Sequence, residues 1–160
     1  MKLRLRKIDR SNWQEAFAIR TKPGQERFVA TPVMSVALAT IRQHGDHYVH
    51  TPMAIYDGAR IVGYVTTLCD PESADDYWID DILIDARYQG KGYGRAAMAE
   101  AIRFALTTWP RCAQIRLSHH PENRIAARLY PSMGFRPTGR LVGSGQPEYQ
   151  LSGAALEDYR

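Results

Sequence analysis

Three glycines occur within five residues in the segment Gln89-Gly90-Lys91-Gly92-Tyr93-Gly94, which follows an apolar run and precedes a helical pattern. A strand that turns directly into a helix leaves backbone N–H groups unpaired at the positive end of the helix dipole. Glycines let the main chain approach an anion closely, and Lys91 and Arg95 add positive charge. This segment, which we call the glycine loop, is therefore predicted to bind a phosphate group.

The spacing of the glycines leaves three nucleotide ligands to compare. A P-loop needs a glycine five residues before its Gly-Lys-Ser/Thr end, but Asp85 stands five residues before Gly90 and Gly92 follows Lys91. The run 92–97 does fit the G-x-G-x-x-A pattern of dinucleotide folds. However, the next expected strand ends without an acidic residue, and too little chain remains for a second βαβ half. Acyl-coenzyme A is the third candidate.

Acidic residues are concentrated before the glycine loop. The chain has a net charge of +4, yet residues 61–86 contain no Lys or Arg and seven acidic residues: Asp70, Glu72, Asp75, Asp76, Asp80, Asp81 and Asp85. The first of these suit a solvated loop, whereas Asp80 and Asp81 interrupt an apolar run and are expected in a strand. Two adjacent carboxylates can attract a cation, or one can accept a proton while repulsion raises one of their coupled pKa values. Both interpretations remain open.

The remaining pattern predicts one α/β domain spanning residues 1–160. Strands are expected at 2–8, 53–56, 60–68, 77–84, 114–118, 135–138 and 148–151, with an Asp57-Gly58 hairpin turn. Helices are expected at 12–19, 33–42, 95–109 and 123–133. This order implies a mixed sheet with helices on both faces.

Composition and residue spacing set expectations for partners. No segment approaches the roughly 20 apolar residues of a membrane span, and no basic run with interleaved aromatics suggests nucleic acid. Cys69 and Cys112 have no close-spaced partner, which favours a cytoplasmic protein without a zinc motif. His44, His47 and His50 are assigned to a flexible solvated loop, so no metal is expected.

Two motifs resemble those of the GNAT (Gcn5-related) N-acetyltransferases. Gln89-x-x-Gly92-x-Gly94 resembles their Q/R-x-x-G-x-G/A pyrophosphate motif, and the segment 123–135 resembles their N-x-x-A-x-x-L-Y-x-x-x-G-F helix. The likeness extends over residues 53–151. It implies the GNAT fold, a mixed but mostly antiparallel sheet of about seven strands that splays at the strand before the glycine loop. It also implies acetyl-CoA as cosubstrate.

The resemblance also implies roles for individual residues. Cofactor-binding positions would be Ile82, Leu83 and Ile84 through their main chain, Gln89, Gly90, Lys91, Gly92, Tyr93, Gly94, Arg95 and Asn123. Asn123 is equally well explained as a helix N-cap. Tyr130 would be the general acid that protonates the leaving thiolate, and Pro131 directly after it is expected to kink the helix.

A finer resemblance, in residues 23–30 and 88–94, is to the bacterial spermine/spermidine acetyltransferase branch. It implies a polyamine acceptor, a homodimer, and Asp80 as a base that acts through a water molecule because aspartate is short. Glu26 and Asp81 would bind the substrate. The alternatives are a protein N-terminal or aminoglycoside acetyltransferase and, in another class, an acyl-CoA-binding sensor without turnover.

Overall fold

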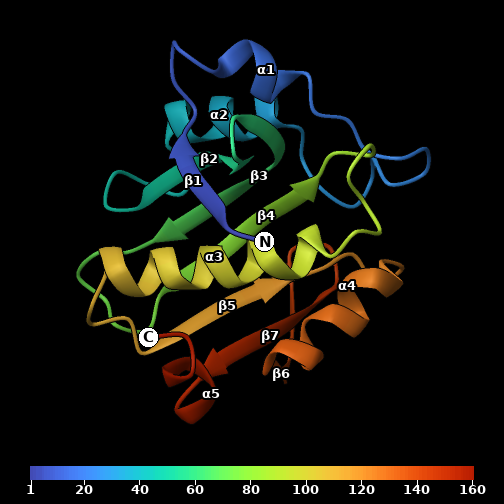
Figure 1. Cartoon of the computed structure of the whole chain (residues 1–160). Coiled ribbons are helices and arrows are strands. Elements are labelled where there is room, and N and C mark those ends of the chain that lie inside the picture. Colours follow the sequence, from blue (N-terminus) through green and yellow to red (C-terminus); the bar gives the residue numbers. More distant parts are fainter.

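The computed structural model describes all residues 1–160 and contains one seven-stranded sheet with helices against it (Figure 1). The strands are β1 (Leu3–Lys7), β2 (Val49–Asp57), β3 (Arg60–Cys69), β4 (Tyr77–Ile84), β5 (Gln114–Ser118), β6 (Arg136–Val142) and β7 (Gln146–Ser152). Their order is β1-β2-β3-β4-β5-β7-β6, and only β4 and β5 pair in parallel. The predicted mixed, mostly antiparallel sheet is confirmed.

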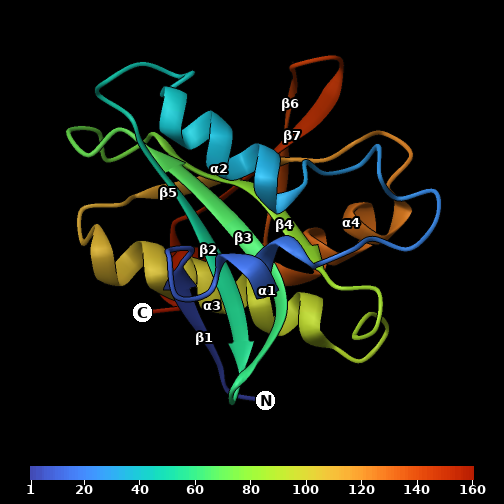
Figure 2. The ribbon, with the colours of Figure 1, turned by 90° about the horizontal axis from the view of Figure 1, so that it is seen from above.

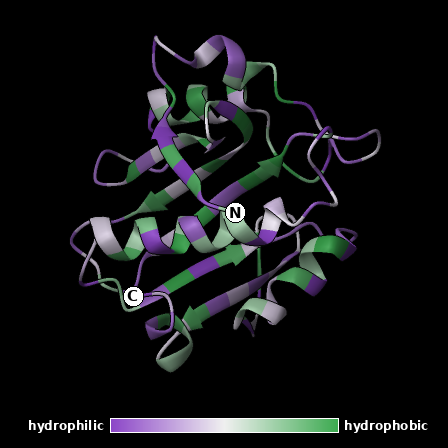
Figure 3. Cartoon of the chain, in the orientation of Figure 1, coloured by the Kyte–Doolittle hydropathy of each residue, from purple (hydrophilic) through white to green (hydrophobic).

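Helices cover both faces of the first half of the sheet. The long helix α3 (Tyr93–Thr108) lies against β1 and β4, and α1 (Trp13–Phe17) and α2 (Pro32–Ile41) lie on the opposite face (Figures 1 and 2). Neighbouring residues of β2 alternate between the two cores: Ile55 belongs to the α3 side, and Ala54 packs with Ala16 of α1. Figure 3 shows the same alternation of hydrophobic and hydrophilic residues along the strands and around α3.

The sheet opens between β4 and β5. These strands pair only at Trp78 and Arg116, so the part of β4 that leads to the glycine loop has no partner on that side. The register between β3 and β4 shifts after Asp81, which leaves Asp80 without a partner in β3. An extra unpaired residue of this kind bends a strand and re-aims its side chains. The splay expected before the glycine loop is therefore present.

The bounds of the elements differ most from the predicted ones in β2, in β6, which runs to Val142, in α4 and at the C-terminus. Strand β2 begins at Val49, so His50 lies in the sheet and not in a flexible loop. Pro52 is tolerated there because β1 reaches only to Met53, which leaves the start of β2 as an edge. Helix α4 (Arg124–Leu129) is followed by a 3₁₀ turn, η1 (Pro131–Met133), since proline cannot continue the α-helical hydrogen bonds. The short C-terminal α5 (Ala154–Glu157) was not predicted.

Candidate functional site

A cavity of about 440 Å³ lies where β4 and β5 separate. Four segments line it: the stretch after α1, the second half of β4, the glycine loop with the start of α3, and the end of β5 with α4. The sequence-predicted residues that line the cavity are Asp80, Asp81, Ile82, Leu83, Ile84, Gln89, Gly90, Gly94, Asn123 and Tyr130. Residues about 50 positions apart in the chain thus meet at one site.

The glycine loop has an open main chain. Gly90 and Gly92 have φ values of +78° and +84°, which side chains rarely adopt, and Gly92 caps the N-terminus of α3. A Cβ added at either position would meet no atom within 4 Å. These glycines are therefore required by backbone conformation, and the space in front of them is free for a ligand.

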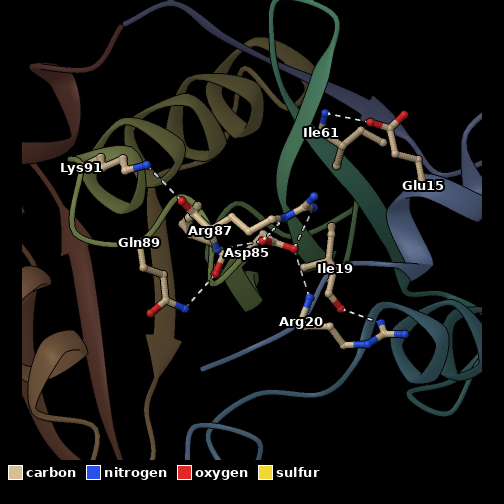
Figure 4. Close-up of polar contacts among 9 residues, drawn as sticks. Glu15, Ile19, Arg20, Ile61, Asp85, Arg87, Gln89 and Lys91 are labelled. Carbon is tan, nitrogen blue, oxygen red and sulfur yellow. Dashed lines mark hydrogen bonds and ion pairs between the residues drawn. The ribbon is translucent and has the colours of Figure 1, made fainter. Parts of the chain in front are cut away.

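The side chain of Gln89 fastens the loop to its surroundings. Its Nε2 donates to the Ile84 carbonyl at the end of β4, a bond drawn in Figure 4, and to Oε1 of Gln25, both at 2.9 Å. The exposed Lys91 donates from Nζ to the Arg87 carbonyl at 3.1 Å. The start of the loop is thus held in place by the chain itself.

Asp85, between β4 and the glycine loop, is a second anchor that sequence reasoning counted only as negative charge. Its buried carboxylate accepts hydrogen bonds from the backbone N and Nε of Arg87 at 2.9 and 2.8 Å and from the backbone N of Arg20 at 3.2 Å (Figure 4). Burial alone would raise the pKa of Asp85, but the bonds to Arg87 and Arg20 outweigh it and the pKa is lowered. Asp85 therefore stays ionised and ties the loop to the segment that follows α1.

Five predicted cofactor or substrate residues lie outside the cavity lining: Glu26, Lys91, Gly92, Tyr93 and Arg95. The Tyr93 hydroxyl donates to Oδ2 of Asp57 at 2.6 Å, and Arg95 donates from Nη2 to Oγ of Ser132 at 2.5 Å, so both side chains attach α3 to its neighbours. Lys91 and Glu26 are exposed outside the lining. Arg95 does border an adjacent surface pocket, together with Arg124 and Arg128.

The two carboxylates of β4 differ in their surroundings. Asp81 accepts hydrogen bonds from Oγ of Ser35 at 3.1 Å and from the backbone N of Ala30 at 3.3 Å. Burial and then the charge of Asp80 raise the pKa of Asp81 to about 6. Asp80 is more exposed, with 39% of its side-chain surface accessible. In this pair, two hydrogen bonds hold the carboxyl group of Asp81 in place, whereas the carboxylate of Asp80 accepts none and is the free carboxylate of the cavity.

Tyr130 lies at the end of α4 with a buried ring. It keeps helical backbone angles and donates its N–H to the Ala126 carbonyl at 3.1 Å, so Pro131 redirects the chain only after the tyrosine. Burial and then the charge of Asp81 raise the pKa of Tyr130 to about 12. The hydroxyl is thus protonated throughout the neutral range and can donate.

Asn123 does serve as a helix cap, since its Oδ1 accepts from the backbone N of Ala126 at 3.1 Å while the residue also lines the cavity.

Other lining residues were not selected from the sequence. Gln25 lines the cavity where Glu26 was expected to, because the geometry of an irregular segment does not follow from its residue order. His119 at the end of β5 is buried in the lining with its ring 6.0 Å from that of Tyr130. The described residues contain no group of three or more His, Cys, Asp or Glu side chains that could hold a metal ion. No helix is both long and apolar enough to cross a membrane.

Comparison with known proteins places these features in context. A model of the Acetyltransferase (GNAT) family matches residues 5–135. The spermine/spermidine N(1)-acetyltransferase of Bacillus subtilis strain 168 is 35% identical over 105 residues, covering 62% of this chain and 68% of the relative. The N-alpha-acetyltransferase RimI of Mycobacterium tuberculosis is 31% identical over 110 residues, covering 68% and 61%.

Solved structures share the fold. A chimera of the spermidine N-acetyltransferase SpeG from Vibrio cholerae with hSSAT has a TM-score of 0.71 at 18% identity, covering 99% of this chain and 98% of that one. The aminoglycoside acetyltransferase AAC(6')-Ib in complex with coenzyme A and kanamycin has a TM-score of 0.77 at 20% identity, with 98% of each chain covered.

Proposed function

The chain belongs to the acetyltransferase (GNAT) family of acetyl-CoA-dependent enzymes, and we propose that it acetylates a primary amine of a small polycation, a polyamine such as spermidine or spermine. One observation carries this proposal. Asp80 and Asp81 lie in the same cavity as the glycine loop and Tyr130. The two carboxylates would attract a cationic amine, and the glycine loop would bind the phosphates of an acyl-CoA. The two substrates would then meet in one cavity.

The residues present fit acetyl-CoA. The open main chain of Gly90 and Gly92 at the start of α3 would receive the pyrophosphate, and the unpaired side of β4 at 82–84 would receive the pantetheine. Asn123 would contact the same arm from α4. The adjacent Arg95, Arg124 and Arg128 add positive charge for the phosphate-bearing end. When bound, acetyl-CoA supplies a thioester whose acetyl group the amine accepts.

Two side chains would handle the protons. Asp80, as the free carboxylate, accepts a proton from the substrate ammonium through a water molecule, which makes the nitrogen nucleophilic. Tyr130 is protonated at neutral pH and donates to the leaving thiolate, and solvent restores it. Asp81 and Glu26 would attract the distal charges of the acceptor; of these, only Asp81 lines the cavity.

The choice of a polyamine rests on the relatives as well as on charge. Two Bacillus subtilis relatives, at 35% and 34% identity, bear the names of spermine/spermidine and probable spermine N(1)-acetyltransferases. Of the seven acidic residues in 61–86, Asp80 and Asp81 lie on β4 and line the cavity. An uncharged or singly charged acceptor would gain less from both carboxylates.

The test is release of free thiol from acetyl-CoA with purified protein and a panel of amines: spermidine, spermine, kanamycin and a peptide with a free N-terminus. We expect the highest kcat/KM with the polyamines. Activity only on the peptide, or only on kanamycin, would show that the acceptor is not a polyamine. Binding of acetyl-CoA without thiol release for any amine would contradict the proposed catalysis. Asp81→Asn should raise the KM for spermine more than the KM for a monoamine of similar length.

A further inference from the structure

His50 is a buried histidine with no hydrogen-bond partner. Only 6% of its side-chain surface is accessible, and neither Nδ1 nor Nε2 has a partner. Buried polar groups are nearly always satisfied, and exceptions in native proteins tend to have a functional reason. The residue therefore requires an explanation beyond packing in β2.

Asp80 is the charged group nearest to this imidazole. Nε2 of His50 lies 3.9 Å from Oδ2 of Asp80, which is too long for a hydrogen bond but close enough to become one after a small movement. The bulge at Asp80 makes this approach possible, because Asp80 has no partner in the intervening strand β3. The buried imidazole of His50 thus lies next to the carboxylate of Asp80, which lines the cavity.

Besides Asp80, one other titratable side chain acts on His50, that of His44. In β3 the residue opposite is Leu68, and α2 has no charged side chain. From the loop before β2, the exposed His44 places its ring 5.8 Å from that of His50. Burial, together with His44, lowers the pKa of His50 against the opposing effect of Asp80. At neutral pH the ring is therefore uncharged and has a free lone pair.

We propose that His50 takes over the proton that Asp80 removes from the substrate and passes it to solvent beside His44, so that Asp80 is regenerated without using the substrate entrance. The proposal rests on the proposed function, because it assumes that Asp80 is the base. His50 acts through Asp80 and touches no reacting atom, so it is a positioning and relay residue.

The transfers balance in protons and charge. The substrate N–H bond breaks as its proton passes to the bridging water, and that water gives one of its own protons to Asp80, which becomes neutral while the water is restored. The O–H bond of Asp80 breaks as an N–H bond forms on Nε2 of His50, which becomes imidazolium while Asp80 is again a carboxylate. The imidazolium then releases a proton to water next to His44. Both groups regain their starting charge, and no further reactant is required.

The first experiment tests the pair without any acetyl transfer. The ring of His50 is titrated by NMR in the full-length protein and in Asp80→Asn. Because the carboxylate raises the pKa of His50, the variant should titrate at lower pH. An unchanged titration would overturn the proposal and would leave the proposed function untouched.

The second experiment measures kcat and KM against pH with spermine for His50→Gln, Asp80→Asn and the double variant. We expect His50→Gln to lower kcat about tenfold or more, within the range of proton-transfer effects, with an unchanged KM for acetyl-CoA. The double variant should lose little more than Asp80→Asn alone, because the two residues act in sequence. Losses that multiply would overturn the relay.

Controls come from the same loop. His47 is exposed and packs on Tyr48, so His47→Gln should keep the wild-type kcat and pH profile. His44→Gln should give a smaller loss than His50→Gln. If His50→Gln does not fold, as judged by its thermal melt, the NMR titration of Asp80→Asn decides the proposal by itself.

Discussion

The hydroxyl of Ser35 in α2 donates a hydrogen bond of 3.1 Å to the carboxylate of Asp81 in β4. The same carboxylate accepts from the backbone N of Ala30, whose carbonyl accepts from the buried hydroxyl of Tyr64. Helix α2, the segment before it, β3 and β4 therefore meet at the acidic end of the cavity. The position of the acceptor site depends on how α2 packs on the sheet.

Asp81→Asn should stabilise the fold at neutral pH. The pKa of Asp81 is raised to about 6, so between about pH 4 and 6 the folded state binds the proton more tightly than the unfolded chain does. Wild-type stability therefore falls as pH rises through this window and stays lower above it. We expect the variant to gain on the order of 1–2 kcal/mol at pH 7.5 and nearly nothing at pH 4.

Urea unfolding at both pH values measures this difference. Asp80→Asn is the comparison variant: it leaves Asp81 buried and removes only the smaller cause of the raised pKa, the charge of Asp80, so its gain at pH 7.5 should be smaller. A gain of equal size at pH 4 and pH 7.5, or an equal gain in Asp80→Asn, would contradict the explanation from burial.

Tyr130→Phe should lower kcat about tenfold to a hundredfold while the affinity for acetyl-CoA changes little. The ring is buried against His119 and Phe135, and phenylalanine keeps these contacts. Only the donating hydroxyl is removed. The measurements are steady-state kinetics and a calorimetric titration with acetyl-CoA.

Tyr149→Phe is the control for this variant. Tyr149 packs within 6.3 Å of the Tyr130 ring but does not line the cavity. We expect near wild-type kcat from it. A similar loss in both variants, or loss of acetyl-CoA binding in Tyr130→Phe, would argue that the hydroxyl acts through packing.

Gly63→Ala should destabilise the protein by about 1–3 kcal/mol and weaken acetyl-CoA binding. A Cβ at Gly63 would lie 2.3 Å from the Leu83 carbonyl, so β4 must move away from β3 at the residues proposed to contact pantetheine. Urea unfolding and acetyl-CoA titration provide the two readouts. Wild-type values for both would show that β4 adjusts without consequence for the site.

Local patterns in the sequence were enough to predict most of the fold. The Asp57-Gly58 turn, the apolar stripe of α3 and the break at Pro131 each depend on a few adjacent residues, and each is present. Strand β2 was predicted too short because Pro52 and the histidines before it are unusual in strands. They are accommodated because β1 does not extend beside them, which is a property of the tertiary structure.

The candidate site likewise has parts that local sequence patterns predict and parts that depend on the tertiary structure. The glycine loop was recognisable because its function depends on consecutive backbone groups. The bulge that leaves Asp80 unpaired and the approach of His50 depend on the register of β2 and β4 against β3. Register depends on the side-chain pattern of both strands and on turn geometry together, so a shift within a strand pair does not follow from either run of residues alone. Gln25 was missed for a related reason, since its contact with Gln89 joins residues 64 positions apart.

Gly92→Ala should weaken acetyl-CoA binding more than its effect on stability explains. Gly92 has φ of +84° at the N-terminus of α3, so alanine there costs about 1–2 kcal/mol in backbone strain and places a methyl group before the proposed pyrophosphate site.

Gly143, in the turn after β6, also has a positive φ, +54°, and open space around its Cα. Gly143→Ala therefore carries strain of a similar kind away from the cavity. We expect both variants to lose comparable free energy of unfolding in urea, and only Gly92→Ala to bind acetyl-CoA at least tenfold more weakly by calorimetry. If the two variants bind acetyl-CoA with equal affinity, the main chain at Gly92 does not contact the cofactor, whatever the loss of stability.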